Sequence, residues 1–177
     1  MKIISLDDFL QQQDFFIAEA KSGKLFVYPT DTVYGIWAIY TAENVEKIVK
    51  IKQSKEKRQP SIIVPSFEWI QENFPEADKE LMKKQLEHYH GVTYIFDYNK
   101  PWMRIIKHPI QEFVTNLGEW FISTSCNISG KTPITTIQDI PEEITNNVEF
   151  IIDGGIGWGK PSVLIDFVSN KVIERDA

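Results

Sequence analysis

The sequence contains a single cysteine, Cys126, so the chain cannot form an intramolecular disulfide. Its first residues, MKIISLDDFLQQQ, lack the apolar segment of a secretory signal peptide. No apolar run approaches the roughly 18 residues that a membrane-spanning helix requires. These absences exclude disulfide-rich secreted proteins and membrane proteins, and we expect a cytoplasmic protein with no membrane partner.

Cations are also scarce, because 19 lysines and arginines face 25 acidic residues and the formal net charge is -6. Proteins that bind nucleic acid over a broad surface need clustered cations, so any contact of that kind must be local. The length of 177 residues, with 42% hydrophobic and 25% charged residues, is typical of one globular domain. We therefore predict a single domain over residues 1–177.

Three common catalytic patterns are absent. No G-x-S-x-G elbow exists, and no histidine is placed to act as its base, which argues against a catalytic serine. The three histidines and Cys126 have no zinc-ligand spacing, so no protein-held metal is predicted. Residues 154–160 imitate the start of a P-loop, but Pro161 stands where a magnesium-binding hydroxyl belongs, and a strand is expected to follow.

Apolar residues recur along the chain with the periods of strands and helices in turn. Helices are predicted over residues 5–22, after the N-cap Thr41, and over 67–74, 78–88, 109–117 and 140–144. Strands are predicted over residues 25–28, 61–64, 92–96, 120–122, 150–152, 163–167 and 171–173. This order favours an α/β or α+β fold in which helices pack on a sheet, with some antiparallel pairing near residue 170.

Two predicted strands end in polar corners. Residues 25–28 are apolar at every position, as in a strand covered on both faces, and Pro29 ends that strand before the polar residues 30–32. The segment STSCNISG, residues 123–130, places four hydroxyls and an amide directly after another strand. Such groups hydrogen-bond a carboxylate or a phosphate, although they are also common in turns. Ligands bind at strand ends in open α/β sheets, so we predict binding residues in both corners.

The most basic stretch is KQSKEKRQP, residues 52–60, which holds four cations and one acid. A polyanion such as a nucleoside triphosphate needs several cations converging on its phosphates. A solvated surface loop is an equally open interpretation of this stretch on the sequence alone. Its place between a helix and a strand favours a role in binding.

Taken together, five segments resemble the YrdC-type family of threonylcarbamoyl-AMP synthases, in order and spacing over nearly the whole chain. They are YPTDTVYG at residues 28–35, the lysine-rich stretch ending in Pro60-Ser61, STSCNISG, the loop Asp153-Gly154-Gly155, and Pro161-Ser162. The resemblance implies a twisted mixed sheet flanked by helices around a concave basic cavity, in the minimal single-domain form of the family.

The activity implied by this resemblance is that of an L-threonylcarbamoyladenylate synthase, a nucleotidyltransferase. Such an enzyme joins L-threonine, bicarbonate or CO₂, and ATP into threonylcarbamoyl-AMP and pyrophosphate, with Mg²⁺ carried by the nucleotide. The product serves the N6-threonylcarbamoyl modification of adenosine 37 in tRNA, so tRNA is an implied partner, either directly or through the transfer machinery. No covalent enzyme intermediate is required, which agrees with the lack of a credible nucleophile.

The resemblance also implies which residues form the site. The cations that would face the phosphates in catalysis are Lys52 and Arg58. The residues that would bind threonine or the nucleotide are Thr30, Thr32, Tyr34, Ser123, Ser125, Asn127, Arg104, Ser162 and Arg175.

One departure from the family pattern leaves alternatives open, because Ser54 stands where the arginine of a K-x-R motif is expected. Losing one phosphate cation costs roughly 1.5 to 3 kcal/mol of charge-assisted hydrogen bonding. A second hypothesis is therefore an RNA-binding module that keeps the fold and has little or no synthase activity. A third is a carbamoyl-transfer domain of the kind found in the much longer hydrogenase maturation proteins.

Overall fold

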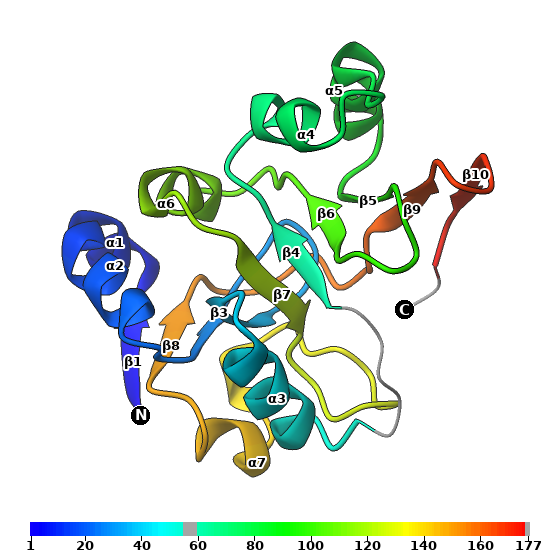
Figure 1. Cartoon of the computed structure of the whole chain (residues 1–177). Coiled ribbons are helices and arrows are strands. Elements are labelled where there is room, and N and C mark those ends of the chain that lie inside the picture. Colours follow the sequence, from blue (N-terminus) through cyan, green and yellow to red (C-terminus); the bar gives the residue numbers. More distant parts are fainter. Residues whose placement is uncertain (55–59, 176–177) are drawn as a thin grey trace.

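A computed structural model describes residues 1–54 and 60–175, which build one ten-stranded mixed sheet with helices on both of its faces (Figure 1). The strand order is β1-β8-β2-β3-β7-β4-β6-β5-β9-β10. Parallel and antiparallel neighbours occur together, since β1 and β2 both run parallel to β8, whereas β3 and β4 both run antiparallel to β7. The predicted α/β fold with a mixed sheet flanked by helices is confirmed.

The strands are β1 Lys2–Ser5, β2 Phe26–Tyr28, β3 Gly35–Ile39, β4 Ser61–Ile63, β5 Val92–Ile95, β6 Trp102–Arg104, β7 Phe121–Ser125, β8 Phe150–Asp153, β9 Val163–Asp166 and β10 Lys171–Ile173. The helices are α1 Leu6–Gln11, α2 Gln13–Lys21, α3 Ala42–Ile51, α4 Phe67–Asn73, α5 Lys79–His88, α6 Ile110–Leu117 and α7 Glu142–Thr145, with a 3₁₀ turn at Ile137–Asp139. Among residues 1–54 and 60–175, no helix is long and apolar enough to cross a membrane.

Strand β2 is buried on both faces, as its uninterrupted apolar sequence predicts. Phe26 and Tyr28 face the core formed with α1, α2 and α6, whereas Val27 faces the core formed with α3 and α7. Figure 1 shows these two groups of helices on opposite sides of β2, β3 and β7. The chain that follows β2 is therefore fixed at the centre of the molecule.

A third apolar cluster supports the half of the sheet that contains β5, β6 and β9. Helices α4 and α5 contribute Ile70, Met82 and Leu86, which pack with Val92 and Tyr94 of β5. Figure 1 shows α4 and α5 together above these strands. Helices thus cover both halves of the sheet. The strand ends that lie between the two halves are left for polar residues.

The helix predicted over residues 5–22 begins where it was expected but is not continuous. Strand β1, which was absent from the prediction, ends at Ser5, and the helix is divided at Gln12, whose backbone leaves the helical region at φ -113° and ψ 31°. Ser5 caps α1 by accepting a hydrogen bond from the backbone N–H of Asp8. Strand β1 has four residues and pairs with β8, about 150 positions away, so no local pattern marks it.

Two more strands, β3 and β6, were absent from the prediction. Strand β3 comes directly after the polar corner and pairs with both β2 and β7. Strand β6 has only three residues and lies between β4 and β5. The prediction of a helix ending at Gly118 is confirmed, because Gly118 adopts the left-handed conformation at φ 72° that ends α6.

Candidate functional site

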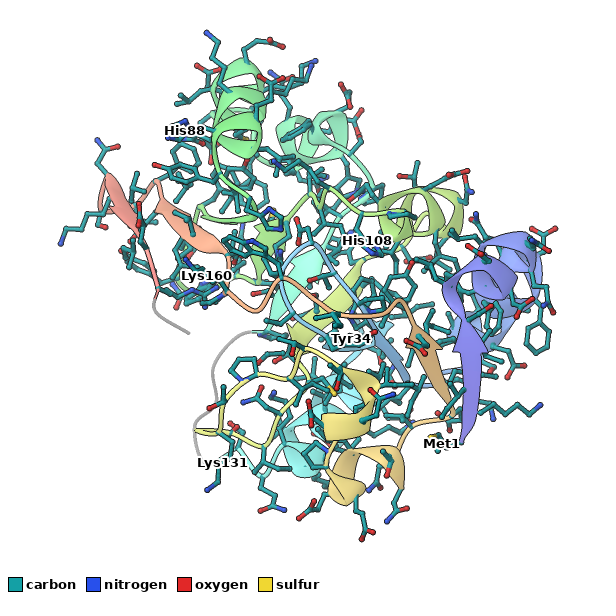
Figure 2. The ribbon with its side chains drawn as sticks, turned by 180° about the vertical axis from the view of Figure 1, so that it is seen from behind. Met1, Tyr34, His88, His108, Lys131 and Lys160 are labelled. Atoms are coloured by element: carbon teal, nitrogen blue, oxygen red, sulfur yellow. The ribbon has the colours of Figure 1, made fainter. Side chains whose placement is uncertain are left out.

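A cavity of about 330 Å³ opens where the polar corner after β2 meets the ends of β7 and β5. This volume lies within the range of small-molecule sites. Figure 2 shows Tyr34 toward the middle of the molecule and the loops carrying Lys131 and Lys160 one below the other at its side. These two loops contribute Ser129 and Ser162 to the cavity wall.

Nine of the eleven predicted site residues line this cavity. They are Thr30, Thr32, Tyr34, Lys52, Arg104, Ser123, Ser125, Ser162 and Arg175. Ser54, at the position where an arginine was expected, lines it as well. Asn127 is not among the lining residues, and Arg58, like Lys55 and Lys57, lies outside the residues that the structure describes.

The hydroxyls of the first corner are hydrogen-bonded to one another and to the backbone. Thr30 Oγ1 donates to the carbonyl oxygen of Val33 at 2.8 Å and accepts from the backbone N–H of Thr32 at 3.0 Å. It also lies 2.9 Å from Thr32 Oγ1. Thr30 and Thr32 are buried, so this local network holds the corner in one conformation before any ligand binds.

The Tyr34 hydroxyl connects the corner to the glycine-rich loop after β8. It donates to the carbonyl oxygen of Gly155 at 2.8 Å and accepts from the backbone N–H of Gly154 at 3.1 Å. Burial raises the pKa of this phenol, with a further rise from the charge of Asp153. The loop leads into β9 and not into a helix, so the P-loop-like sequence at 154–160 forms no P-loop. Tyr34 thus fixes one wall of the cavity.

Lys52, directly after α3, holds the second corner in place through its ammonium group. Its Nζ donates to the carbonyl oxygens of Ser125 and Asn127, the latter at 2.8 Å, and to Asn127 Oδ1 at 3.3 Å. In return, the backbone N–H of Ser129 donates to the carbonyl oxygen of Lys52 at 2.8 Å. Asn127 does not line the cavity, and it orients Lys52 by accepting hydrogen bonds from its ammonium group. The prediction instead expected the Asn127 amide to contact the ligand.

Burial lowers the pKa of Lys52 to about 8 from its ordinary 10.5. Between those two values the unfolded chain binds more protons than the folded chain, so the free energy of unfolding rises with pH. We expect the free energy of unfolding to rise by up to about 3 kcal/mol between pH 8 and 10.5 because of Lys52. Urea unfolding from pH 8 to 10.5 measures it, and Lys52→Met should remove this part of the rise. If the free energy of unfolding rises equally with pH in the two proteins, Lys52 is not the group responsible for the rise.

Arg104, on β6, forms a buried ion pair with Asp31 of the first corner. Arg104 Nη2 lies 2.6 Å from Asp31 Oδ1 and 3.4 Å from Thr32 Oγ1. The two side chains are 8% and 2% exposed, respectively. Because breaking a buried ion pair strands a charge, this contact ties β6 to the corner.

A second arginine reaches the cavity from beyond β10. Arg175 Nε donates to the carbonyl oxygen of Ser162 at 2.9 Å, and its Nη2 donates to Ser162 Oγ at 2.8 Å. Ser162 Oγ also lies 2.7 Å from Thr93 Oγ1 of β5. Burial lowers the pKa of Arg175, and repulsion from Arg104 lowers it further, so the two guanidinium groups are close enough to interact.

The cavity wall combines three cations with many hydroxyls and no carboxylate among the described lining residues. The cations are Lys52, Arg104 and Arg175. Such a wall attracts anions and supplies donors to carboxylate or phosphate oxygens. Among residues 1–54 and 60–175, no group of three or more histidine, cysteine or acidic side chains is placed to hold a metal ion.

Sequence reasoning missed Asp31 and Thr93 as parts of the site. Asp31 was noted only as a polar corner residue, and its partner Arg104 lies 73 positions away, so no local signal links the two. Thr93 was assigned only to the strand predicted over residues 92–96, with no role in the site. Both residues are buried and polar, Asp31 in the bend after β2 and Thr93 within β5, and burial demands a partner for each.

The chain is similar in sequence to known synthases. The chain is 26% identical to the threonylcarbamoyl-AMP synthase of Marinobacter nauticus, with 85% of this chain and 88% of that protein covered. It is 24% identical to the threonylcarbamoyl-AMP synthase of Vibrio campbellii, with 88% of this chain and 94% of that protein covered.

Solved structures share the fold. Escherichia coli YciO superposes with a TM-score of 0.78 at 19% identity, over 98% of this chain and 93% of that one. Pyrococcus abyssi Sua5 complexed with L-threonine superposes with a TM-score of 0.79 at 24% identity, over 95% of this chain. This chain spans only 55% of the Sua5 chain. The model of the Sua5/YciO/YrdC family, which carries the description "Telomere recombination", matches residues 19–176, so the chain belongs to the Sua5/YciO/YrdC family.

Proposed function

We propose that this protein is an L-threonylcarbamoyladenylate synthase, a nucleotidyltransferase that consumes L-threonine, bicarbonate or CO₂, and ATP. The observation that carries the proposal is the cavity wall, in which three cations and a set of hydroxyls converge without a carboxylate among the described lining residues. The names of the related synthases and the threonine complex of Sua5 support it over an RNA-binding module without activity.

In this proposal the site works by positioning and by charge neutralisation. The threonine amine attacks CO₂ and loses a proton to solvent, which gives a carbamate, and a carbamate oxygen then attacks the α-phosphorus of ATP. The bond from that phosphorus to the bridging oxygen breaks, and pyrophosphate leaves. Lys52, Arg104 and Arg175 stabilise the negative charge that moves onto the leaving phosphates.

Magnesium enters with the nucleotide in this proposal, since the described lining residues offer hydroxyls but no carboxylate to hold it. The product then supplies the threonylcarbamoyl group for adenosine 37 of tRNA, which makes tRNA a partner, directly or through transfer proteins. A cytoplasmic location fits these substrates.

The test is pyrophosphate release from Mg·ATP with threonine and bicarbonate, combined with mass spectrometry of the nucleotide product. We expect pyrophosphate and the threonylcarbamoyl adduct of AMP together, and neither when threonine is omitted. Release no greater than that of the Lys52→Ala protein would reject the synthase. Tight, salt-sensitive tRNA binding without ATP turnover would instead favour the RNA-binding module.

A further inference from the structure

Asp31 is buried, charged and close to the cavity, yet it is not one of the residues that line it. Both of its carboxylate oxygens already have partners. Oδ1 accepts from Arg104 Nη2 at 2.6 Å, and Oδ2 accepts from the backbone N–H of Lys107 at 3.2 Å. Asp31 is therefore not poised to take a proton or to contact a ligand directly, and its interactions are all with the protein.

The guanidinium of Arg104 is held on one side only. Nη2 contacts Asp31 and Thr32, whereas the buried Nε–H has no hydrogen-bond partner among the described residues. Nη1 also has no hydrogen bond within the described residues, and it is not one of the buried unpartnered atoms, so it is the group that an acceptor in the cavity can reach. The planar guanidinium suits two oxygens of a carboxylate or a phosphate.

The chain packs tightly around this ion pair at Gly91. A Cβ at Gly91 would lie 2.6 Å from Thr32 Cγ2, 3.4 Å from Arg104 Nη2 and 3.5 Å from Asp31 Oδ1. Only a residue without a side chain fits there unless its neighbours move. The backbone just before β5 thus packs against the ion pair, and leaves its two members little room to rearrange.

We propose that Asp31 is a positioning residue, which anchors Arg104 so that its remaining N–H groups bind an anionic oxygen of the substrate. The inference rests on the proposed function for the identity of the substrates. The shared chemistry is a carboxylate or phosphate oxygen, and its source is either threonine or ATP. Without the anchor, Arg104 samples several rotamers, and binding must order it at an entropic cost.

Calorimetric titration with L-threonine alone and with Mg·ATP alone distinguishes the two sources. We expect Asp31→Asn to weaken binding of one ligand by roughly tenfold and to leave the other within about twofold. Arg104→Met should weaken the same ligand, and adding Asp31→Asn to it should cause little further loss. Two additive losses, or unchanged affinity for both ligands in Asp31→Asn, would overturn the proposal.

Asp166→Asn is the matched control, because Asp166 is also a buried carboxylate with protein partners only. Its Oδ2 accepts from Tyr98 at 2.7 Å and from Ser169 Oγ at 2.6 Å, and it does not line the cavity. We expect this variant to lose stability and to keep both affinities. If Asp166→Asn weakens the same ligand as Asp31→Asn, the effect is a general loss of stability, and the positioning role is wrong.

Two further measurements keep the proposal testable if Asp31→Asn folds poorly. Arg104→Lys keeps a cation against Asp31 but lacks the planar fork, and should weaken the same ligand by roughly tenfold. In addition, ¹⁵N-edited NMR of the ligand-free protein should show distinct, slowly exchanging Nη signals for Arg104. Averaged signals would show that Asp31 does not fix the guanidinium of Arg104, and would overturn the proposal even if the enzyme is active. Failure of the proposed function would appear separately, as no threonine-dependent pyrophosphate release.

Discussion

Lys52→Met is expected to lower pyrophosphate release by roughly 100-fold, because a positive charge beside the developing negative charge is lost. Methionine keeps the unbranched shape of the side chain and most of its length and packing, but carries no charge. The carbonyl oxygens of Ser125 and Asn127 would also lose their shared donor, so the second corner would no longer be held against α3. The rate of threonine-dependent pyrophosphate release at saturating substrates measures the loss.

Lys50→Met is the matched control for this prediction. Lys50 lies in the last turn of α3, two positions before Lys52, but it is exposed and does not line the cavity. It should keep the activity of the unchanged protein. Similar losses in the two variants would show that the charge of the helix end, and not the placement of Lys52, matters. The folded fraction of each variant, from urea unfolding, separates lost chemistry from lost structure.

Gly35→Ala is expected to cost about 3 kcal/mol of stability or more, as an overpacked core substitution does. The added Cβ would lie 2.3 Å from Trp37 Nε1, 3.0 Å from Trp37 Cδ1 and 3.3 Å from the carbonyl oxygen of Thr124. The indole of Trp37 is fully buried, with Tyr28 and Phe121 ring centroids both at 5.2 Å, so it has no space to withdraw. Urea denaturation followed by tryptophan fluorescence measures the loss.

Gly157→Ala provides the comparison, since a Cβ there would meet its nearest neighbours at 3.6 Å, which is ordinary contact. We expect a change of about 1 kcal/mol or less. If both variants unfold at the same urea concentration, the close approach of the Trp37 indole to residue 35 is not what excludes a side chain there.

The central strand and both polar corners could be predicted from the sequence because their signals are local. Residues 25–28 are apolar at each position, and Pro29 ends the ladder before Thr30. In the segment 123–130 the prediction was less exact, because Ser123, Thr124 and Ser125 belong to strand β7 itself, and only Ser129 follows it. Strands β1 and β6 escaped prediction because short strands form only through pairing with distant parts of the chain.

The partners of the charged residues could not be predicted for the same reason. The sequence marked Lys52 as a phosphate-facing cation, but its hydrogen bonds reach backbone oxygens 73 and 75 positions away. The pairing of Asp31 with Arg104 also spans 73 positions. Residue type indicates which charge is present, whereas the sheet order decides which charges meet.

The strand order has a consequence for how the protein acquires its cavity during folding. Strand β9 joins the sheet beside β5, and β8 joins it beside β1 and β2, so the walls close only through contacts between distant segments. Such non-local pairing is slow to form. A nascent chain therefore gains no binding capacity until residues 150–175 have docked. A bound substrate should then slow amide exchange throughout the sheet, because it stabilises the complete fold and not one local segment.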